Sequence, residues 1–516
     1  MALRRTTRLL TWLLAATLVI AGIAFLVLLS VPAPIERWLQ DRVLLALQQH
    51  YQRDVQLKNL RVTLVPIFRA TADDFVLPNR DREGLPPFLT VRHLTAQALP
   101  LELLRKPVHL SWVKLDGLVI NVPPKHVKVA GEPVAPQRET RLANFVIDRV
   151  DADGTELYVL PKQEGREPMN WELRKLTLRS AGIGQPMRFK AELTNPTPPG
   201  IIHTAGKFGP WNWDEPSDTA VSGHYDFKNA DLSIFNGISG ILSSVGDYTG
   251  KLNDIVVDGT TDVPDFKLDR GSKAVHLTTQ FHALIDGTNG DTYLQPVNAK
   301  FLNSRVVAKG EVAGRPGQKG KTISLDVDVH DSRVEDLLNL AVASQRPMLT
   351  GAVSTRAKLL IPPGTQTVLA RMRLSGNFRV SNAKFTSEAV DEKIAALSRR
   401  AQGRPGDESI QDVPASLAGS FSLANAKLSF STLQFEVPGA AAEVKGSYEL
   451  GSEALDFTGD VRLQAKVSQT MSGAKRVLLK PVDPIFSRHN AGTYLPVNVS
   501  GTRDNPQIKL DVKKIF

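Results

Sequence analysis

Thr322–Asp331 reads TISLDVDVHD, and its apolar side chains fall at every second position. Successive side chains of a β-strand point to opposite faces, so this spacing predicts a strand with one apolar face and one wetted face. A helix would need apolar residues three or four positions apart, which this segment lacks. The residues assigned to the apolar face are Ile323, Leu325, Val327 and Val329.

The same alternation recurs on both sides of this segment. It is found in Met187–Leu193, in Val461–Val467 and in Ile508–Val512. The 37 glycines and 33 prolines are spread along the 516 residues, as short strands joined by turns require. Asp116-Gly117 and Asp258-Gly259 are predicted to be turns. The sequence therefore predicts a mainly β protein without the βαβ rhythm of a parallel sheet.

The N-terminal segment is predicted to anchor the chain in a membrane. Residues 9–31 carry no charge and, at 1.5 Å per residue, form a helix of roughly 34 Å, enough to cross the hydrocarbon core. Three arginines within residues 1–8 predict a cytoplasmic N-terminus. A cleaved signal peptide is the alternative, but the following Val31–Pro34 is a poor cleavage site. Residues 32–54 are predicted to form an amphipathic helix that lies on the bilayer or caps the first sheet.

Few helices are expected beyond this anchor. Residues 332–344 form one candidate, because Ser332 and Glu335 have the spacing of a capping box. The segment from Val467 to Leu479 is another candidate, and the Gly- and Ser-rich residues 237–250 are predicted to be a loop or a broken helix. The expected divisions are residues 55–230 (N-terminal β-rich region), 231–386 (central β-rich region), 387–403 (helical insertion) and 404–516 (C-terminal β-rich region).

Signatures of catalysis and of metal binding are not found. The chain has no cysteine, which excludes disulfides, thiol nucleophiles and thiolate-bound metals. Gly314–Thr322 comes closest to a phosphate-binding loop, but a predicted strand rather than a helix follows it, so we interpret it as a hairpin tip. His276 and His282 fall on the polar face of an expected strand and are interpreted as solvated. We expect no enzymatic activity and no cofactor.

Charge and aromatic residues say little about partners. The formal net charge of +10 is spread among interleaved acidic residues, without a dense basic block, so no nucleic-acid partner is expected. Trp211 and Trp213 are either a sugar-stacking pair or a loop plug that closes a sheet edge. Alternation by itself fits both a β-sandwich, whose apolar faces pack together, and an open sheet whose apolar face stays accessible.

A resemblance favours the open sheet. With the anchor and the amphipathic helix, the order of several segments resembles the AsmA-like family, the AsmA/TamB/YhdP group of bacterial envelope proteins. The segments are Leu57–Pro66 (LKNLRVTLVP), Pro100–Leu104 (PLELL), Val113–Val122 (VKLDGLVINV), Gly492–Thr502 (GTYLPVNVSGT) and Asn505–Val512 (NPQIKLDV).

The resemblance implies a single-pass protein of the bacterial inner membrane whose bulk is periplasmic. It implies an elongated, curved antiparallel β-sheet, a repeating β-groove with a few short helices, that handles phospholipid bound for the outer membrane and maintains the envelope. An envelope protein is a further candidate partner, and the alternative function is a scaffold or chaperone for outer-membrane protein assembly. The candidate groove-lining residues are Ile323, Leu325, Val327, Val329, Phe421, Leu423, Leu428, Phe430, Val461 and Leu463.

Overall fold

The computed structural model describes residues 41, 55–63, 67–79, 84–99, 101–102, 108–124, 145–161, 168–182, 185–212, 215–268, 273–315, 318–341, 347–487, 492–502 and 505–510. The predictions for residues 1–8, 9–31 and, apart from residue 41, 32–54 therefore lie outside the described residues. Among the helices that are described, none has the length and apolar character needed to cross a bilayer.

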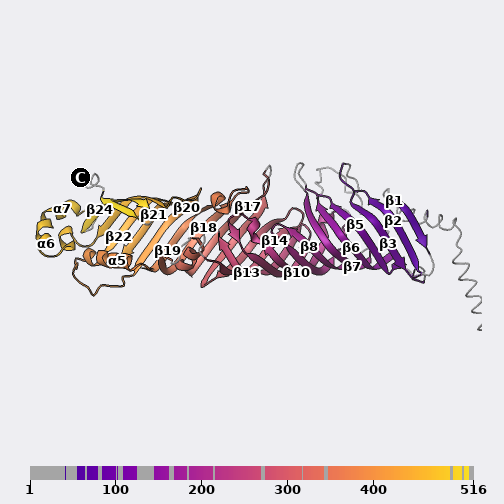
Figure 1. Cartoon of the computed structure of the whole chain (residues 1–516), viewed down its shortest axis with the longest axis horizontal. Helices are drawn as coiled ribbons and strands as arrows, with labels where there is room; N and C mark the ends of the chain where they lie inside the picture. Colours follow the sequence, from indigo (N-terminus) through magenta and orange to yellow (C-terminus); the bar gives the residue numbers. More distant parts are fainter. Residues whose placement is uncertain are drawn as a thin grey trace, which may run out of the picture.

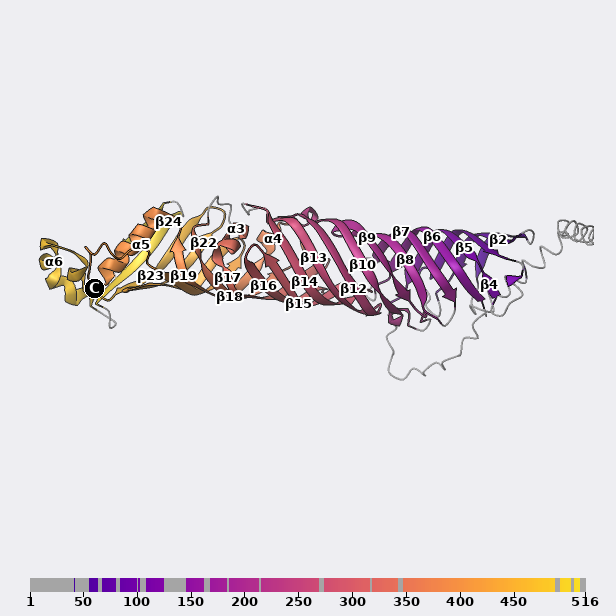
Figure 2. The same ribbon diagram turned by 90° about the horizontal axis from the view of Figure 1, so that it is seen from below.

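The described chain is mainly β, and its strands form one long sheet that gives the molecule its elongated shape (Figures 1 and 2). The N-terminal strands are β1 (Gln56–Thr63), β2 (Phe68–Leu77), β3 (Leu89–Ala98), β4 (Val108–Leu110), β5 (Trp112–Val122), β6 (Phe145–Val159), β7 (Met169–Gly182), β8 (Met187–Pro196) and β9 (Pro199–Phe208).

The central strands continue the sheet after β9, through the middle of the molecule. They are β10 (Ala220–Asp231), β11 (Ile238–Ser239), β12 (Ile241–Lys251), β13 (Asp254–Leu268), β14 (Val275–Asp286), β15 (Asp291–Phe301), β16 (Ser304–Gly314), β17 (Lys321–Arg333), β18 (Leu349–Ile361) and β19 (Arg373–Phe385). The C-terminal strands are β20 (Ala415–Ala424), β21 (Lys427–Val437), β22 (Ala440–Glu449), β23 (Ala454–Leu463), β24 (Thr493–Thr502) and β25 (Pro506–Leu510).

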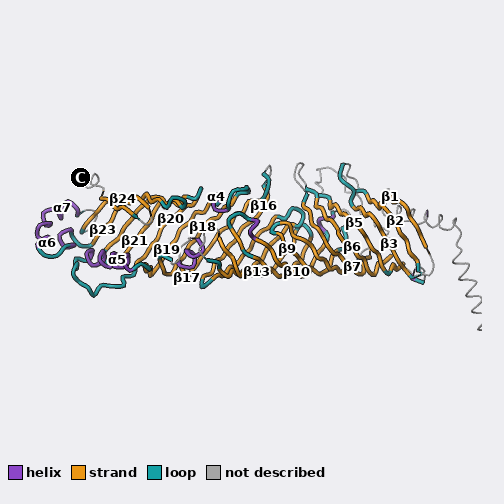
Figure 3. The backbone as a smooth tube through the Cα atoms, in the orientation of Figure 1, coloured by secondary structure: helices purple, strands orange, loops and turns teal. Residues whose placement is uncertain are grey.

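Short helices interrupt the strands, and they appear purple in Figure 3. The α-helices are α3 (Val334–Ala341), α4 (Val368–Arg371), α5 (Glu388–Ala401), α6 (Ala474–Leu479) and α7 (Asp483–Phe486), and the 3₁₀ helices are η2 (Pro216–Asp218), η3 (Leu232–Ile234), η4 (Val467–Thr470) and η5 (Lys480–Val482).

Strand order follows chain order almost throughout, and neighbouring strands are antiparallel. The exceptions are β4 and β5, which both pair in parallel with β6, and the two-residue β11, which pairs with the end of β13 while β10 pairs with β12. All strands in the described residues belong to this one sheet, so no second sheet packs on its apolar face there. A β-sandwich, the rival architecture, is thereby excluded for the described part of the chain.

The sheet has two long margins that differ in what they carry. We call the margin where β17, β19 and β23 end the helix margin, because α3, α5 and α6 follow these strands. The turn margin is the opposite one, where β14, β16 and β18 end. In the middle of the molecule, strands of the front and rear cross in projection, because the sheet curls about the long axis (Figures 1 and 3).

Several local predictions were wrong in informative ways. Residues 237–250 are not a loop but carry β11 and β12. Asp258-Gly259 lies inside β13, and Asp116-Gly117 lies inside β5, where Gly117 has a φ of +66° within a ladder that keeps its register. The predicted capping box does not form either, because the Ser332 hydroxyl donates to the carbonyl oxygen of Arg305.

The helix predictions agree with the structure more closely than the turn and loop predictions do. A helix does follow β17, although α3 begins at Val334, and residues 342–344 lie outside the described residues. The expected helical insertion at 387–403 contains α5. Residues 467–479 form two short pieces, η4 and α6, rather than one helix.

Candidate functional site

The apolar face of the sheet is continuous from strand to strand. Residues directly opposite each other in a ladder point to the same face, so the register traces rows of side chains across the sheet. One row runs unbroken from β7 to β24, and hydroxyl groups enter it at two positions. Its members are Leu176, Ala191, Thr204, Tyr225, Gly246, Gly259, Phe281, Val297, Ala308, Val327, Ala357, Gly376, Phe421, Phe430, Gly446, Phe457 and Val499.

The apolar face forms the inside of the curl. The Tyr248 hydroxyl on β12 reaches over β10 to lie 2.6 Å from Thr204 Oγ1 on β9, which a flat sheet would not allow. Helices α3 and α5 also pack on this face near the helix margin. We call this concave apolar surface the trough.

The structure brings most of the predicted lining residues together in the trough. Val327, Phe421 and Phe430 belong to the row above, and Leu325, Leu423 and Leu428 belong to the next one. Leu359 and Leu374 complete that second row between them. The half-buried members are Ile323, Leu325, Val327, Phe421, Leu428 and Phe430, whereas Val329 and Leu423 are buried.

Val461 and Leu463 have a different environment from the other candidates. Both belong to a packed cluster that includes Ala395 and Ala401 of α5, and Leu463 is buried. The helix covers this margin of the trough, so these two side chains belong to a core rather than to an accessible lining. Alternation could not reveal this, because it assigns a face but not what covers that face.

Aromatic rings lie over glycines on the floor of the trough, a feature that the strand pattern did not predict. Phe378 has its ring centroid 6.1 Å from the rings of both Phe421 and Phe430. A methyl group added at Gly419 would lie 3.2 Å from Phe378 Cε1, and one at Gly446 would lie 2.8 Å from Phe457 Cδ1. The glycines therefore give the rings room to lie flat against the backbone.

A belt of hydroxyl groups crosses the middle of the trough. Tyr225 OH lies 3.0 Å from Ser244 Oγ, and Ser244 Oγ donates to the carbonyl oxygen of Thr260. Burial raises the pKa of Tyr225 and of Tyr248, so both phenols remain protonated at neutral pH. Their partners are other hydroxyls and backbone carbonyls, and no group in the belt carries a charge.

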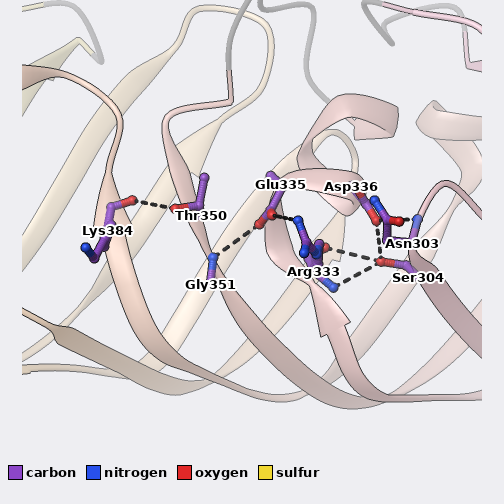
Figure 4. Close-up of polar contacts among 8 residues, drawn as sticks. All are labelled: Asn303, Ser304, Arg333, Glu335, Asp336, Thr350, Gly351 and Lys384. Atoms are coloured by element: carbon purple, nitrogen blue, oxygen red, sulfur yellow. Dashed lines mark hydrogen bonds and ion pairs between the residues drawn. The ribbon is translucent and has the colours of Figure 1, made fainter.

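Helix α3 is fastened at the helix margin by carboxylates (Figure 4). Asp336 is buried, and its Oδ2 accepts hydrogen bonds from the Asn303 backbone N–H at 3.0 Å and from Ser304 Oγ at 2.8 Å. Glu335 Oε2 accepts from the Gly351 backbone N–H at 3.1 Å. These contacts tie the helix to the β15–β16 turn on one side and to β18 on the other.

The convex polar face carries paired charges. Every histidine that the structure describes lies within 3.7 Å of a carboxylate oxygen. The side chains of His276 and His282 lie on this face and are 61% and 42% exposed. A hollow of about 730 Å³ lies over β16 to β19, and the charged residues among those that line it are Lys309, Arg356, Lys358, Asp326 and Asp328. Opposite charges offset one another in it, and Arg356 Nε lies 3.6 Å from Asp328 Oδ2.

For two other candidate sites, the surrounding structure favours one of the two interpretations. Trp211 packs against Phe88 with ring centroids 5.3 Å apart, which supports the plug interpretation, while Trp213 lies outside the described residues. The Gly314–Thr322 segment joins β16 to β17, as a hairpin connection does. Among the described residues, no three acidic or histidine side chains converge where a metal ion could bind.

The fold and the site together define a single-layered, mainly β protein with a concave apolar surface. No family model matches the chain, and neither curated proteins nor solved structures gave a match.

Proposed function

We propose that this chain is a lipid-handling protein of the bacterial envelope, anchored in the inner membrane by residues 9–31. Its trough shelters the acyl chains of phospholipids that travel toward the outer membrane, while their headgroups remain in water. The observation that carries the proposal is the continuous row from β7 to β24, made of apolar residues and glycines apart from Thr204 and Tyr225, with many of its members half-buried. The resemblance to the AsmA-like family supports it independently.

The energetics explain why such a surface would be needed. At about 0.8 kcal/mol per CH₂, exposing one chain of about 16 carbons to water costs on the order of 12 kcal/mol, and two chains cost roughly 25 kcal/mol. Apolar side chains in contact with the tails remove most of this cost, because the tails stay out of water. Backbone groups remain paired along the ladders, so the trough wall presents few unsatisfied donors or acceptors.

Bound lipid and lipid transfer test the proposal together. The full chain is purified in mild detergent, its bound lipids are extracted and weighed, and transfer of a fluorescent phospholipid between donor and acceptor vesicles is followed. Co-purified phospholipid and protein-dependent transfer are expected. An empty protein that crosslinks to unfolded outer-membrane barrel proteins would instead support the chaperone function and overturn this one.

A further inference from the structure

Margins of strands that are far apart in the sheet touch each other. Asn236, in the connection between β10 and β12, lies at the helix margin, whereas Thr365 and Val368, between β18 and β19, lie at the turn margin. Even so, the Val368 backbone N–H donates to the Asn236 carbonyl oxygen at 2.7 Å, and Asn236 Nδ2 donates to the Thr365 carbonyl oxygen at 3.0 Å. Six strand spacings, from β12 to β18, separate these two margins along the sheet.

Two more contacts of the same kind occur toward the N-terminus. Met169 begins β7 at the helix margin, and a methyl group placed on Gly290, in the β14–β15 turn at the turn margin, would lie 2.7 Å from Met169 Cε. Phe88 precedes β3 at the helix margin, and its ring lies 5.3 Å, centroid to centroid, from that of Trp211, which follows β9 at the turn margin. Within the described residues, opposite margins thus meet at these three places, each after five or six strand spacings.

These contacts fix how tightly the sheet curls. Six spacings of about 4.8 Å cover roughly 29 Å across the strands, and eleven residues, the length of β12, cover about 37 Å along them. A sheet that meets itself after this displacement has a circumference of roughly 47 Å and a backbone radius of about 7–8 Å. Small β-barrels of this size hold side chains or one small ligand. An interior of this width is too narrow for a hydrated headgroup.

We propose that the contact of Asn236 with Thr365 and Val368 is a clasp that gates the trough. The inference rests on the proposed function. Because the trough is apolar, a charged headgroup stays in the water between the two margins while its tails lie inside. A clasp that joins the margins then stands in the path of the headgroup. The lipid passes only when the clasp opens, and the clasp consists of two hydrogen bonds between surface connections.

Crosslinking tests the gate, since the chain has no cysteine of its own. Asn236→Cys and Thr365→Cys are introduced together in the full chain and joined with a short bis-maleimide that a reductant cleaves. The control is a crosslink between Ser420→Cys and Thr432→Cys, which lie opposite each other on the polar face of β20 and β21 and span no margin. Circular dichroism verifies that each crosslinked protein remains folded.

Vesicle-to-vesicle transfer of a fluorescent phospholipid is then measured before crosslinking, after crosslinking and after reduction. We expect the clasp crosslink to slow transfer at least tenfold and reduction to restore it, while the control crosslink changes the rate less than twofold. Transfer that continues at the uncrosslinked rate would overturn the gate and leave the proposed function standing. If the uncrosslinked double variant and the unmodified chain both transfer no lipid, the proposed function itself fails and the gate with it.

Discussion

Two kinds of residue shape the trough: half-buried apolar side chains such as Leu325, and the buried carboxylate of Asp336, which fastens α3. Alternation placed Leu325 on the apolar face, and the structure agrees. The role of Asp336 was hidden, because its partners Asn303 and Ser304 precede it by about thirty residues and the pairing of β16 with β17 brings them together. A local pattern reports the face of a residue, whereas a long-range contact depends on register and curvature.

Leu325→Asp tests whether the trough is accessible to lipid. A carboxylate in an open, half-buried position can be solvated, so the variant is expected to fold while lipid transfer falls at least tenfold. Thermal unfolding and the vesicle transfer rate are the measurements, with Ser324→Asp on the opposite face of β17 as the matched control. Gross unfolding of the Leu325 variant alone would mean that the position is sealed in a core.

Asp336→Ala tests the fastening of α3. The substitution leaves the Asn303 N–H and the Ser304 hydroxyl without their buried acceptor, so the free energy of unfolding is expected to fall by about 2–4 kcal/mol. Chemical denaturation measures the change. Glu392→Ala, on an exposed position of α5, is the control and is expected to stay within about 0.5 kcal/mol of the unmodified chain. An equally small effect at Asp336 would show that α3 is held by its apolar contacts instead.

Asp151 gives a pH dependence with a defined sign. Burial alone would raise its pKa, but hydrogen bonds from Trp112, Arg149 and Thr177 outweigh burial and hold the pKa below the ordinary value of 3.8. The carboxylate therefore contributes stability above pH 3.8, and this contribution is lost as the pH falls through the lower folded-state pKa.

The unfolding free energies of the unmodified chain and of Asp151→Asn are compared at pH 7 and at pH 3. The stability advantage of the unmodified chain is expected to narrow at the lower pH. Asp153→Asn, at an exposed position on the same strand, should show no such narrowing. If the difference in unfolding free energy between the unmodified chain and Asp151→Asn were the same at both pH values, the lowered pKa of Asp151 would be contradicted.

At the scale of elements, strands with clean alternation were predictable and glycine-rich strands were not. β17 and β8 coincide with alternating segments. Glycine and serine usually mark turns, so the sequence predicts a loop or a broken helix at β12, but Gly246 lies under the ring of Tyr225 on the neighbouring strand. In this strand glycine makes room for an aromatic ring and does not mark a turn. The sequence of one strand does not show which strand will lie beside it, so this role of glycine could not be predicted.

Gly246→Ala tests this packing. The added methyl group would lie 2.4 Å from the Asp258 carbonyl oxygen and 2.8 Å from Tyr225 Cε1, so strand and ring must both shift. The free energy of unfolding is expected to fall by about 1–3 kcal/mol in chemical denaturation. Gly451→Ala is the matched control, because a methyl group there meets no atom within 4 Å. Equal stabilities of the two variants would rule out a packing role for Gly246.

At the scale of the whole molecule, the alternation of apolar and polar residues could not decide between a β-sandwich and an open sheet. Alternation gives every strand one apolar face in both architectures, and the difference is whether a second layer covers it. The resemblance of ordered segments pointed to a single curved sheet, and the described residues form one. The margin contacts of Asn236 and Met169 were not predictable, because they arise from the cumulative curl of six strands.

Small-angle scattering of residues 55–516 measures the overall shape. The 25 strands of the described sheet give a length on the order of 100 Å. With a width of about 30 Å, such a body has a radius of gyration of about 30 Å, whereas a compact protein of this length would give about 23 Å. A monomer near the smaller value would contradict the extended sheet.

The near-consecutive pairing of strands has a consequence for how such a protein changes its reach over evolution. Each hairpin contacts mainly the hairpins before and after it, as in repeat proteins. Duplication or loss of one hairpin would alter the span by up to about 10 Å and leave the cross-section as it was. The hairpin is then a unit of measure, because the number of hairpins sets the length of the trough.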